Sequence, residues 1–217
     1  MALGRRSPAD GGGEGVDGGD GQGMTVDFTD YEALVLDWDG TLVDSQYLNV
    51  TSLAAALAPY DVPVEEGWYR QRIGTSTGDL LAELGVPAAQ HAEIITRCGE
   101  LIIESISTLR PFLEVVRWVE AARVGGLRCA VASGGGGAVV RAGIAGTGLG
   151  RLFDVVVTRE AVSRGKPAPD LFLEAARRLG VDAGQCLVLE DADEGLAAAE
   201  AAGMDAVDVR PWVDPRW

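Results

Sequence analysis

The chain contains very little of several residue types that build common functional sites. Histidine occurs once, as His91, so a metal centre with several histidine ligands is excluded and this residue is expected at the surface. The three cysteines, Cys98, Cys129 and Cys186, are widely spaced and form no CxxC pair. This spacing favours a reducing compartment over a disulfide framework and predicts a cytoplasmic protein. No apolar run reaches membrane-spanning length, so no membrane association is expected.

Basic residues are also scarce. The chain has 18 lysines and arginines against 33 aspartates and glutamates, which gives a formal net charge of -15. Nucleic acids and anionic membranes bind basic patches, so neither is expected as a partner. A small anionic substrate remains compatible with this charge, because a metal ion or a few local cations can reverse the sign inside a pocket. Lys166 is the single lysine of the chain, which points to a compact positive charge with a specific task.

The length and the apolar content support a folded core. With 217 residues and 47% hydrophobic residues, the chain is long enough for one core domain with a modest insertion. Residues 1–26 are rich in glycine and aspartate and almost free of large apolar side chains, so we predict a disordered tail there. A monomer is the default expectation for the oligomeric state.

The remainder of the chain has the pattern of an α/β protein. Short apolar runs alternate with helical patterns after residue 111, and this alternation predicts a Rossmann-like parallel sheet sandwiched by helices. In such a sheet every strand ends at the same edge. Strands are predicted at 33–36, 127–132, 153–158, 186–190 and 206–209, and helices of this part at 113–124, 138–144, 169–179 and 194–202.

Between the first and the second predicted strand lies a block that reads as helices only. Asp44 and Ser45 have the character of a helix N-cap, and helical periodicity follows through Leu57. Further helices are predicted at 65–73, 77–84 and 88–107. We therefore predict an inserted all-helical block over residues 46–110, with the α/β core formed by residues 27–45 and 111–217.

Two aspartates stand at the end of the first predicted strand. Asp37 and Asp39 are followed by Gly40, which allows a sharp turn. Two carboxylates about 4 Å apart repel by roughly 4 kcal/mol at an effective dielectric constant of about 20. A fold retains such a pair when a cation offsets the repulsion or when chemistry uses both groups. The alternative interpretation is that both residues serve in a turn and a helix cap.

Three other strand ends carry polar groups to the same edge. Ser133 and the glycines at 134–137 form a possible anion cradle, Lys166 follows the third strand, and Glu190 and Asp191 end the fourth. Each feature alone also fits a plain role as a flexible turn, a surface lysine or a helix cap. Together, the carboxylates suit Mg²⁺, which prefers oxygen ligands, and the hydroxyl, amides and lysine suit a phosphoryl group.

The order and spacing of these segments resemble the haloacid dehalogenase-like superfamily of phosphohydrolases. The likeness extends from about Tyr31 to Val209 and rests on DWDGTLVDS, the serine after the second strand, RGKPAPD, and LED before GLAAAEAAGM. The helical block looks like the small cap of that family. The resemblance implies a nucleophile that becomes an aspartyl-phosphate, a general acid and base, bound Mg²⁺ and a phosphate pocket. The implied nucleophile is Asp37, and the implied general acid and base is Asp39. Mg²⁺ would be held by Asp37, the Asp39 carbonyl and Asp191, with Glu190 in or just outside the metal shell. The phosphate would be held by Thr41, Ser133, the Gly134 amide and Lys166.

Within this resemblance the sequence favours a phosphatase of a small phosphorylated metabolite, such as phosphoglycolate or a sugar phosphate. The dehalogenases of the family lack the second aspartate, which is present here as Asp39. Mutases similar to β-phosphoglucomutase are the alternative, but they use a cap histidine and a cap lysine, whereas this chain has Asn49 and no lysine there. A non-catalytic regulatory relative is the third possibility. The large Trp38, whose ring is expected in the core, and Ala192, where many relatives have serine, depart from the family pattern.

Overall fold

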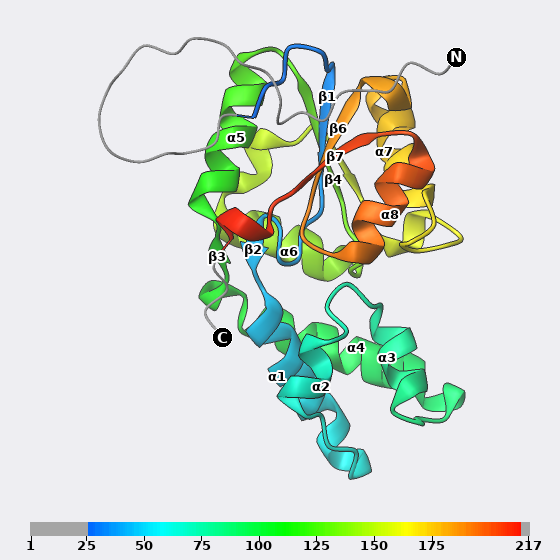
Figure 1. The fold of residues 1–217 in the computed structure, drawn as a ribbon. Coiled ribbons are helices and arrows are strands. Elements are labelled where there is room, and N and C mark those ends of the chain that lie inside the picture. The colour runs from blue at the N-terminus through cyan, green and yellow to red at the C-terminus, as the bar shows by residue number, and fades with distance from the viewer. Residues whose placement is uncertain (1–25, 214–217) are drawn as a thin grey trace.

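The computed structural model describes residues 26–213, and these form a layered α/β part above a unit of helices (Figure 1). The predicted disorder of the N-terminal tail falls almost entirely on residues outside this described part. Among the described residues, no helix combines the length and the apolar character needed to cross a membrane.

The α/β part is built on a parallel sheet of five strands, as the sequence predicted. The spatial order is β5-β4-β1-β6-β7, and the strands are aligned so that Leu36 at the end of β1 lies opposite Val131 on β4 and Leu189 on β6. The order reverses between β1 and β6, the point at which such sheets bind ligands beyond the carboxyl ends of their strands. The strands are β1 (Ala33–Leu36), β4 (Arg128–Ala132), β5 (Val155–Val157), β6 (Cys186–Glu190) and β7 (Asp205–Asp208).

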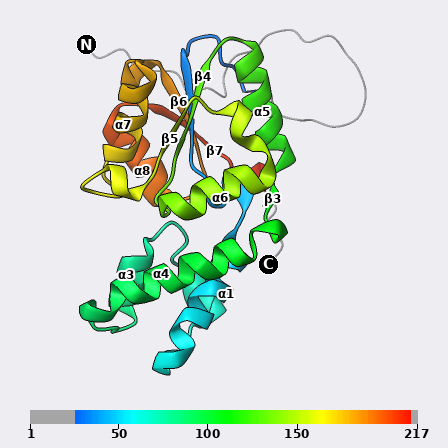
Figure 2. The same ribbon diagram turned by 180° about the vertical axis from the view of Figure 1, so that it is seen from behind.

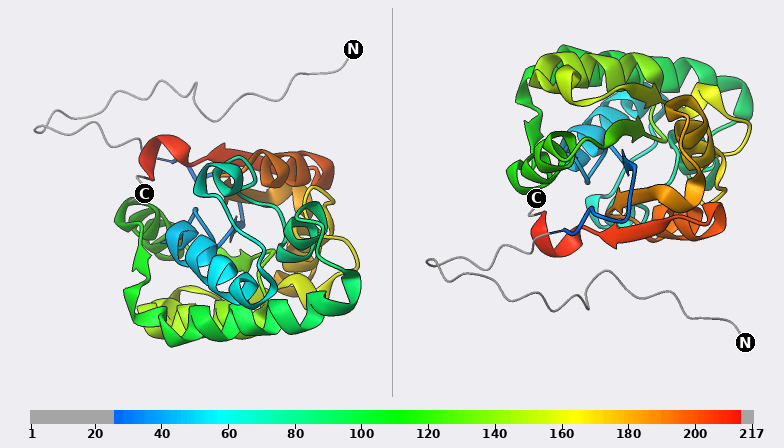
Figure 3. Two further views of the ribbon diagram at one scale, coloured as in Figure 1. Left: turned by 90° about the horizontal axis from the view of Figure 1, so that it is seen from below. Right: turned by 90° about the horizontal axis from the view of Figure 1, so that it is seen from above.

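Strand β1 is buried on both faces because helices cover both sides of the sheet (Figures 2 and 3). Leu34 and Leu36 belong to the apolar cluster under one pair of helices, whereas Ala33 and Val35 belong to the cluster under the other pair. This alternation follows from the period of two along a strand. The first face is covered by α5 (Leu113–Val124) and α6 (Gly137–Thr147), and the second by α7 (Asp170–Leu179) and α8 (Asp193–Ala202).

The helices between β2 and β3 have an apolar core of their own, which includes Leu53, Leu81 and Ile94. This unit contains α1 (Gln46–Leu57), α2 (Glu66–Arg70), α3 (Thr77–Glu83) and α4 (Ala88–Glu104). The helix predicted at 65–73 is too long, because α2 ends at Arg70 and a turn follows. The division into cap and core at residues 46–110 remains a prediction.

Two short strands that the sequence did not predict join the two parts. Strand β2 (Val43–Asp44) leads into α1, strand β3 (Arg110–Pro111) leads back to the sheet, and the two pair antiparallel. Helix α4 also runs beside α6 (Figure 2). Short 3-10 helices at Ala58–Tyr60, Ile106–Thr108, Leu149–Leu152, Arg159–Ala161, Ala183–Gln185 and Arg210–Trp212 complete the described elements.

The indole of Trp38 lies in the core, as expected, with 1% of the residue exposed. It fits because the neighbouring helix α6 carries Gly143. A Cβ at this glycine would lie 2.7 Å from Cζ2 of the indole, closer than side-chain packing permits. The large Trp38, between the two aspartates, is therefore accommodated by the absence of a side chain at Gly143, which lies far along the chain.

Candidate active site

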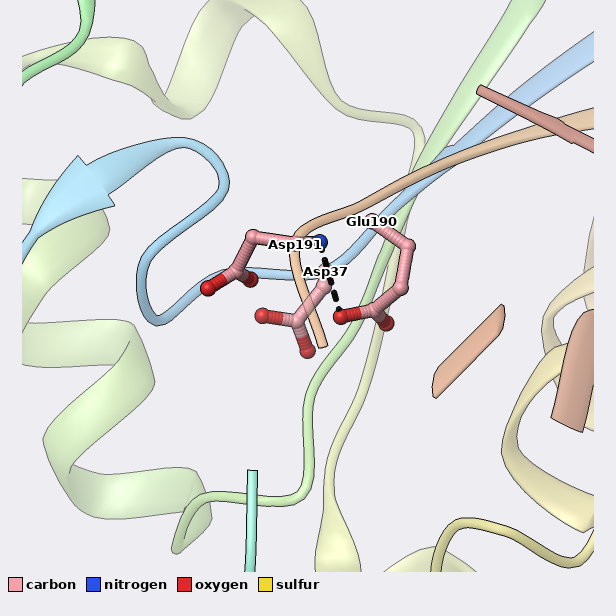
Figure 4. Close-up of side chains that lie close together, drawn as sticks. All are labelled: Asp37, Glu190 and Asp191. Atoms are coloured by element: carbon pink, nitrogen blue, oxygen red, sulfur yellow. Dashed lines mark hydrogen bonds between the residues drawn. The ribbon is translucent and has the colours of Figure 1, made fainter. Parts of the chain in front are cut away.

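Three carboxylates meet where β1 and β6 end (Figure 4). Asp37 follows β1, Glu190 is the last residue of β6, and Asp191 comes next. One carboxylate oxygen from each lies within 4.8 Å of the others. The structure thus brings together three of the side chains that the sequence placed at this edge, and it does so because parallel strands deliver their carboxyl ends to one side.

Lys166 binds two of these carboxylates. Its ammonium nitrogen donates a hydrogen bond to Oδ1 of Asp37 and another, of 2.7 Å, to Oε2 of Glu190. The lysine side chain is only 7% exposed. Burial works against the charged form, but the two carboxylates outweigh it, so the pKa of Lys166 is raised above its ordinary value. The single lysine of the chain is therefore a buried cation held against the predicted nucleophile.

Glu190 is fully engaged by groups of the protein. Besides the bond to Lys166, its Oε1 accepts from the backbone N–H groups of Asp191 (3.1 Å) and Ala192 (3.0 Å). A Cβ at Gly195 would lie 2.0 Å from the carboxyl carbon of Glu190, so the helix backbone also presses against it. These contacts favour a position just outside a metal shell over direct ligation. They also explain why Ala192 is tolerated, since its main chain makes the bond.

Asp191 is held on its other side by Thr41. The threonine hydroxyl donates to Oδ1 of Asp191 at 2.8 Å, so this predicted phosphate contact supports a predicted metal ligand here. Gly40 approaches the second oxygen: it has φ +87°, and a Cβ there would lie 2.2 Å from Oδ2 of Asp191. Burial first, and then the charge of Glu190, raise the pKa of Asp191 to about 7.

The balance of charge in this buried group fits a divalent cation. Three carboxylates face one ammonium, which leaves two negative charges when all groups are ionised. Burial, together with the neighbouring carboxylates of Glu190, Asp191 and Asp39, raises the pKa of Asp37 although Lys166 opposes the shift. Mg²⁺ takes oxygen ligands and keeps waters for a substrate phosphate, so the donor set matches this ion.

The glycine-rich loop after β4 offers fewer available amides than the sequence predicted. Ser133 is fully buried, and its Oγ accepts from the N–H of Gly135 at 2.9 Å. The N–H of Gly137 donates to both carboxylate oxygens of Glu160, at 2.9 and 3.1 Å. Gly134 remains as the predicted amide for phosphate. Glu160 gave no signal in the sequence, because its contact joins residues 23 positions apart.

Asp39 lies beside the three carboxylates but is bound by helix α1. Its Oδ1 accepts from Ser45 Oγ at 2.6 Å and from Asn49 Nδ2 at 3.1 Å. Ser45 does occupy the N-cap position of α1, as predicted, but the expected capping hydrogen bond is absent because its hydroxyl is turned to Asp39. Sequence reasoning missed the roles of Ser45 and Asn49 at the site. The spacing of four residues on one helix face was the available signal.

Three comparisons describe what the chain is similar to. The sequence profile of the haloacid dehalogenase-like hydrolases matches residues 34–209. The fructose-1-phosphate phosphatase YqaB of Escherichia coli strain K12 is 35% identical over 187 residues, which are 83% of this chain and 97% of that protein. The validoxylamine A 7'-phosphate phosphatase of Streptomyces hygroscopicus subsp. limoneus is 27% identical over 82% of this chain and 84% of its own length. The crystal structure of CbbY from Rhodobacter sphaeroides in complex with phosphate shares the fold, with a TM-score of 0.75, 24% identity, and coverage of 81% of this chain and 84% of that one.

Proposed function

The chain belongs to the haloacid dehalogenase-like hydrolases, and on this basis we propose that it is a magnesium-dependent phosphatase of small phosphomonoesters, with sugar phosphates as the leading substrate class and phosphoglycolate as the alternative. The observation that carries the proposal is the buried cluster of Asp37, Glu190 and Asp191 with Lys166 held against the nucleophile. The leading substrate class draws on the two related phosphatases, which are named for the phosphate esters of a sugar and of validoxylamine A.

The proposed reaction has two steps. In the first, a carboxylate oxygen of Asp37 attacks phosphorus, the bond from phosphorus to the ester oxygen breaks, and Asp39 gives a proton to that leaving oxygen. In the second, Asp39 takes a proton from water as the water oxygen attacks phosphorus. The bond from phosphorus to Asp37 then breaks, and both aspartates return to their first state. Lys166 and the Gly134 amide hold phosphate oxygens, on which negative charge increases.

Asp37, the main-chain carbonyl of Asp39 and Asp191 are the groups that would hold Mg²⁺, with Glu190 just outside. When bound, the ion supplies positive charge that offsets the carboxylates and polarises the phosphoryl group. Thr41 fixes one oxygen of Asp191, and Lys166 fixes Asp37, so both groups are oriented by the protein itself. This preorganisation supports a catalytic role rather than that of a non-catalytic relative.

A mutase reaction is not favoured. It requires the phosphate to return to the same class of substrate, with a cap histidine and a cap lysine to handle the second sugar. This chain has Asn49 at the first position, and its only lysine is bound to Asp37 and Glu190 in the core. Two arginines of the helical unit also have partners there: Arg70 pairs with Glu66, and Arg72 pairs with Glu83.

Phosphate release from 4-nitrophenyl phosphate and from fructose 1-phosphate tests the proposal. The full chain should hydrolyse both esters with added Mg²⁺, and EDTA should abolish the activity. Asp37→Asn should lose at least about a thousandfold in kcat, because the amide is no nucleophile. Asp61→Asn is a matched control, since Asp61 lies at the end of the 3-10 helix after α1, far from this chemistry in the chain, and asparagine tolerates its left-handed conformation (φ 54°). Equal activity in Asp37→Asn and the unmodified chain would refute the proposal.

A further inference from the structure

The first turn of helix α1 departs from the usual pattern of helix starts. Ser45 occupies the N-cap position, where a serine side chain ordinarily accepts a hydrogen bond from the second or third helical N–H group. Here the serine makes no such bond, although it is 97% buried (3% exposed) and has no access to water as a substitute. A serine that occupies the N-cap position without capping the helix is expected where its side chain has a task at a functional site.

The hydroxyl of Ser45 is used on Asp39. Ser45 Oγ and Asn49 Nδ2 both donate to Oδ1 of Asp39, at 2.6 and 3.1 Å. Asn49 Nδ2 also lies 3.4 Å from Ser45 Oγ, so the two donors stand side by side on one face of α1. Gln46, between them, directs its amide nitrogen to the Asp39 carbonyl oxygen at 3.4 Å. Three residues from the start of α1 thus contact Asp39, which lies in the connection between β1 and β2.

The two oxygens of Asp39 are in different surroundings. Oδ1 carries two donors, whereas Oδ2 accepts no hydrogen bond from any residue in the range 26–213. Oδ2 instead faces the loop after β4: a Cβ built on Gly135 would lie 3.4 Å from it and 3.1 Å from Ser133 Oγ. An oxygen whose lone pairs accept two hydrogen bonds is a poor place for a proton. Oδ2 is therefore the oxygen of Asp39 that is free of protein donors among the described residues, and it is directed toward the loop that carries the predicted phosphate contacts.

We propose that Ser45 and Asn49 are positioning residues that fix Asp39 through Oδ1 and so present Oδ2–H to the leaving oxygen of the substrate. This inference rests on the proposed function. As the bond from phosphorus to the ester oxygen breaks, its electron pair stays on that oxygen, which takes the proton from Oδ2. The carboxylate that results is stabilised by the two donors already on Oδ1. The next proton comes from the water that attacks the aspartyl-phosphate.

The inference predicts a loss that depends on the leaving group. An alcohol leaves poorly without a proton, whereas 4-nitrophenolate leaves without one. General acid catalysis contributes typically about 10²–10⁴ in rate. In Asn49→Leu and Ser45→Ala, kcat/KM for fructose 1-phosphate should therefore fall by about tenfold or more, while kcat/KM for 4-nitrophenyl phosphate changes by less than about threefold. This constant reports the steps up to departure of the leaving group.

The control is Thr51→Ala. Thr51 lies on the same helix, and its hydroxyl donates only to the carbonyls of Tyr47 and Leu48 among the described residues. Its loss should leave both constants unchanged. In an Asp39→Asn background, Asn49→Leu should cause no further loss on fructose 1-phosphate, because the group it positions is absent. Asn49→Gln, which keeps the amide but moves it by one methylene, gives the same contrast between esters where Asn49→Leu does not fold.

The outcomes separate the two proposals. A selective loss on fructose 1-phosphate supports the positioning role. An equal loss on both esters, or no loss on either, overturns it while the phosphatase assignment stands. A full chain that hydrolyses neither ester overturns the proposed function and, with it, this inference.

Discussion

At the scale of single residues, Gly195 and Glu190 depend on each other. Gly195 is the third residue of α8, and a Cβ there would collide with the carboxylate that holds Lys166. The glycine is therefore needed for space, although alanine is the better helix former by about 1 kcal/mol. A displacement of Glu190 would also affect Asp37, the proposed nucleophile, because Lys166 binds both carboxylates.

Gly195→Ala should destabilise the protein by about 1–3 kcal/mol, as overpacking of a close-packed site does. It should also lower kcat/KM by displacing Glu190 and then Lys166. Gly67→Ala in α2 is the matched control, since a Cβ there meets nothing within 4 Å. That change should stabilise by about 0.5–1 kcal/mol. Thermal unfolding and initial rates of both variants check the prediction, and a stabilised, fully active Gly195→Ala variant would contradict it.

The carboxyl group of Asp191 predicts a pH dependence. Its pKa of about 7 in the metal-free protein exceeds the ordinary 3.8, because burial and Glu190 disfavour the charged form. In the proposed site Mg²⁺ would bind this carboxylate and so compete with the proton. Affinity for Mg²⁺ should therefore rise with pH up to about 7 and level off above it, falling by up to about tenfold per pH unit below.

The same shift has a defined sign for stability. Because the folded-state pKa of Asp191 is raised, the metal-free protein should lose stability as the pH rises from about 4 to about 7. Added Mg²⁺ should reverse this loss. Titration calorimetry of Mg²⁺ binding between pH 5 and pH 8, with chelator-treated protein and Asp191→Asn for comparison, checks both statements. An affinity that is constant over this range would exclude a role for Asp191 protonation.

At the scale of secondary structure, the start of α6 is fixed by a residue from another connection. Glu160, in the 3-10 helix after β5, accepts from the N–H of Gly137 and from the hydroxyl of Thr158 at 2.8 Å. A carboxylate at a helix N-terminus is favourable because the amides there are unpaired. The bond also sets the course of the loop that carries Ser133 and Gly134.

Glu160→Ala should therefore weaken inhibition by inorganic phosphate several-fold, while binding of Mg²⁺ stays the same. It should also destabilise the protein by about 0.5–2 kcal/mol, the usual effect of losing a cap. Glu120→Ala is the control, because Glu120 pairs with Arg151 at the surface of α5. Inhibition constants and calorimetry measure the two effects. Weaker binding of both ions in Glu160→Ala would point to general loosening instead.

The strand and helix pattern was largely predictable, because burial on both faces leaves continuous apolar runs and exposed helices leave a period of 3.6. Helix α5 begins and ends at the predicted residues, and β6 does so as well. Strands β2 and β3 escaped prediction because each has two residues, too few for any periodicity. The helix at 65–73 was predicted too long because no glycine or proline directly follows Arg70, where α2 ends.

At the scale of the whole molecule, the three thiols are packed into the cores of both parts. Cys98 lies in the helical unit, and Cys129 and Cys186 lie on sheet strands. Burial raises their pKa values to about 11, about 12 and about 11, respectively. At pH 8 the thiolate fraction of each is then at most about 0.1%, which suppresses reaction with disulfide reagents.

Ellman's reagent should accordingly modify none of the cysteines in the native protein at pH 8 and all three after unfolding in guanidinium chloride. Because the reactive form is the thiolate, any slow modification of the native protein should become only about tenfold faster when the pH is raised from 8 to about 9. Rapid modification of one thiol in the native state would show that its part of the core opens locally.

The meeting of the carboxylates at one edge of the sheet was predictable from the sequence, whereas the residues that support them were not. Residues such as Asp37 and Asp191 follow strands directly, so the topology alone brings them together. The supporting residues lie on other elements: Ser45 and Asn49 bind Asp39, and Glu160 binds the N–H group of Gly137. Only the three-dimensional packing determines which polar group each of them meets. The hydrogen bonds of Thr41 to Asp191 and of Lys166 to Glu190 could not be predicted either, since a side chain at this edge of the sheet can be turned to any of several neighbours.

The antiparallel pair of β2 and β3 has a consequence for how this architecture can change. The backbone leaves and rejoins the sheet layer at neighbouring points, with Val43 opposite Pro111 and Asp44 opposite Arg110. Residues 45–109 thus form an inserted segment whose two ends lie next to each other. Residues beyond the first turn of α1 can therefore be added or removed without separating β2 from β3, whereas exchange of the whole segment would also remove the hydrogen bonds of Ser45 and Asn49 to Asp39.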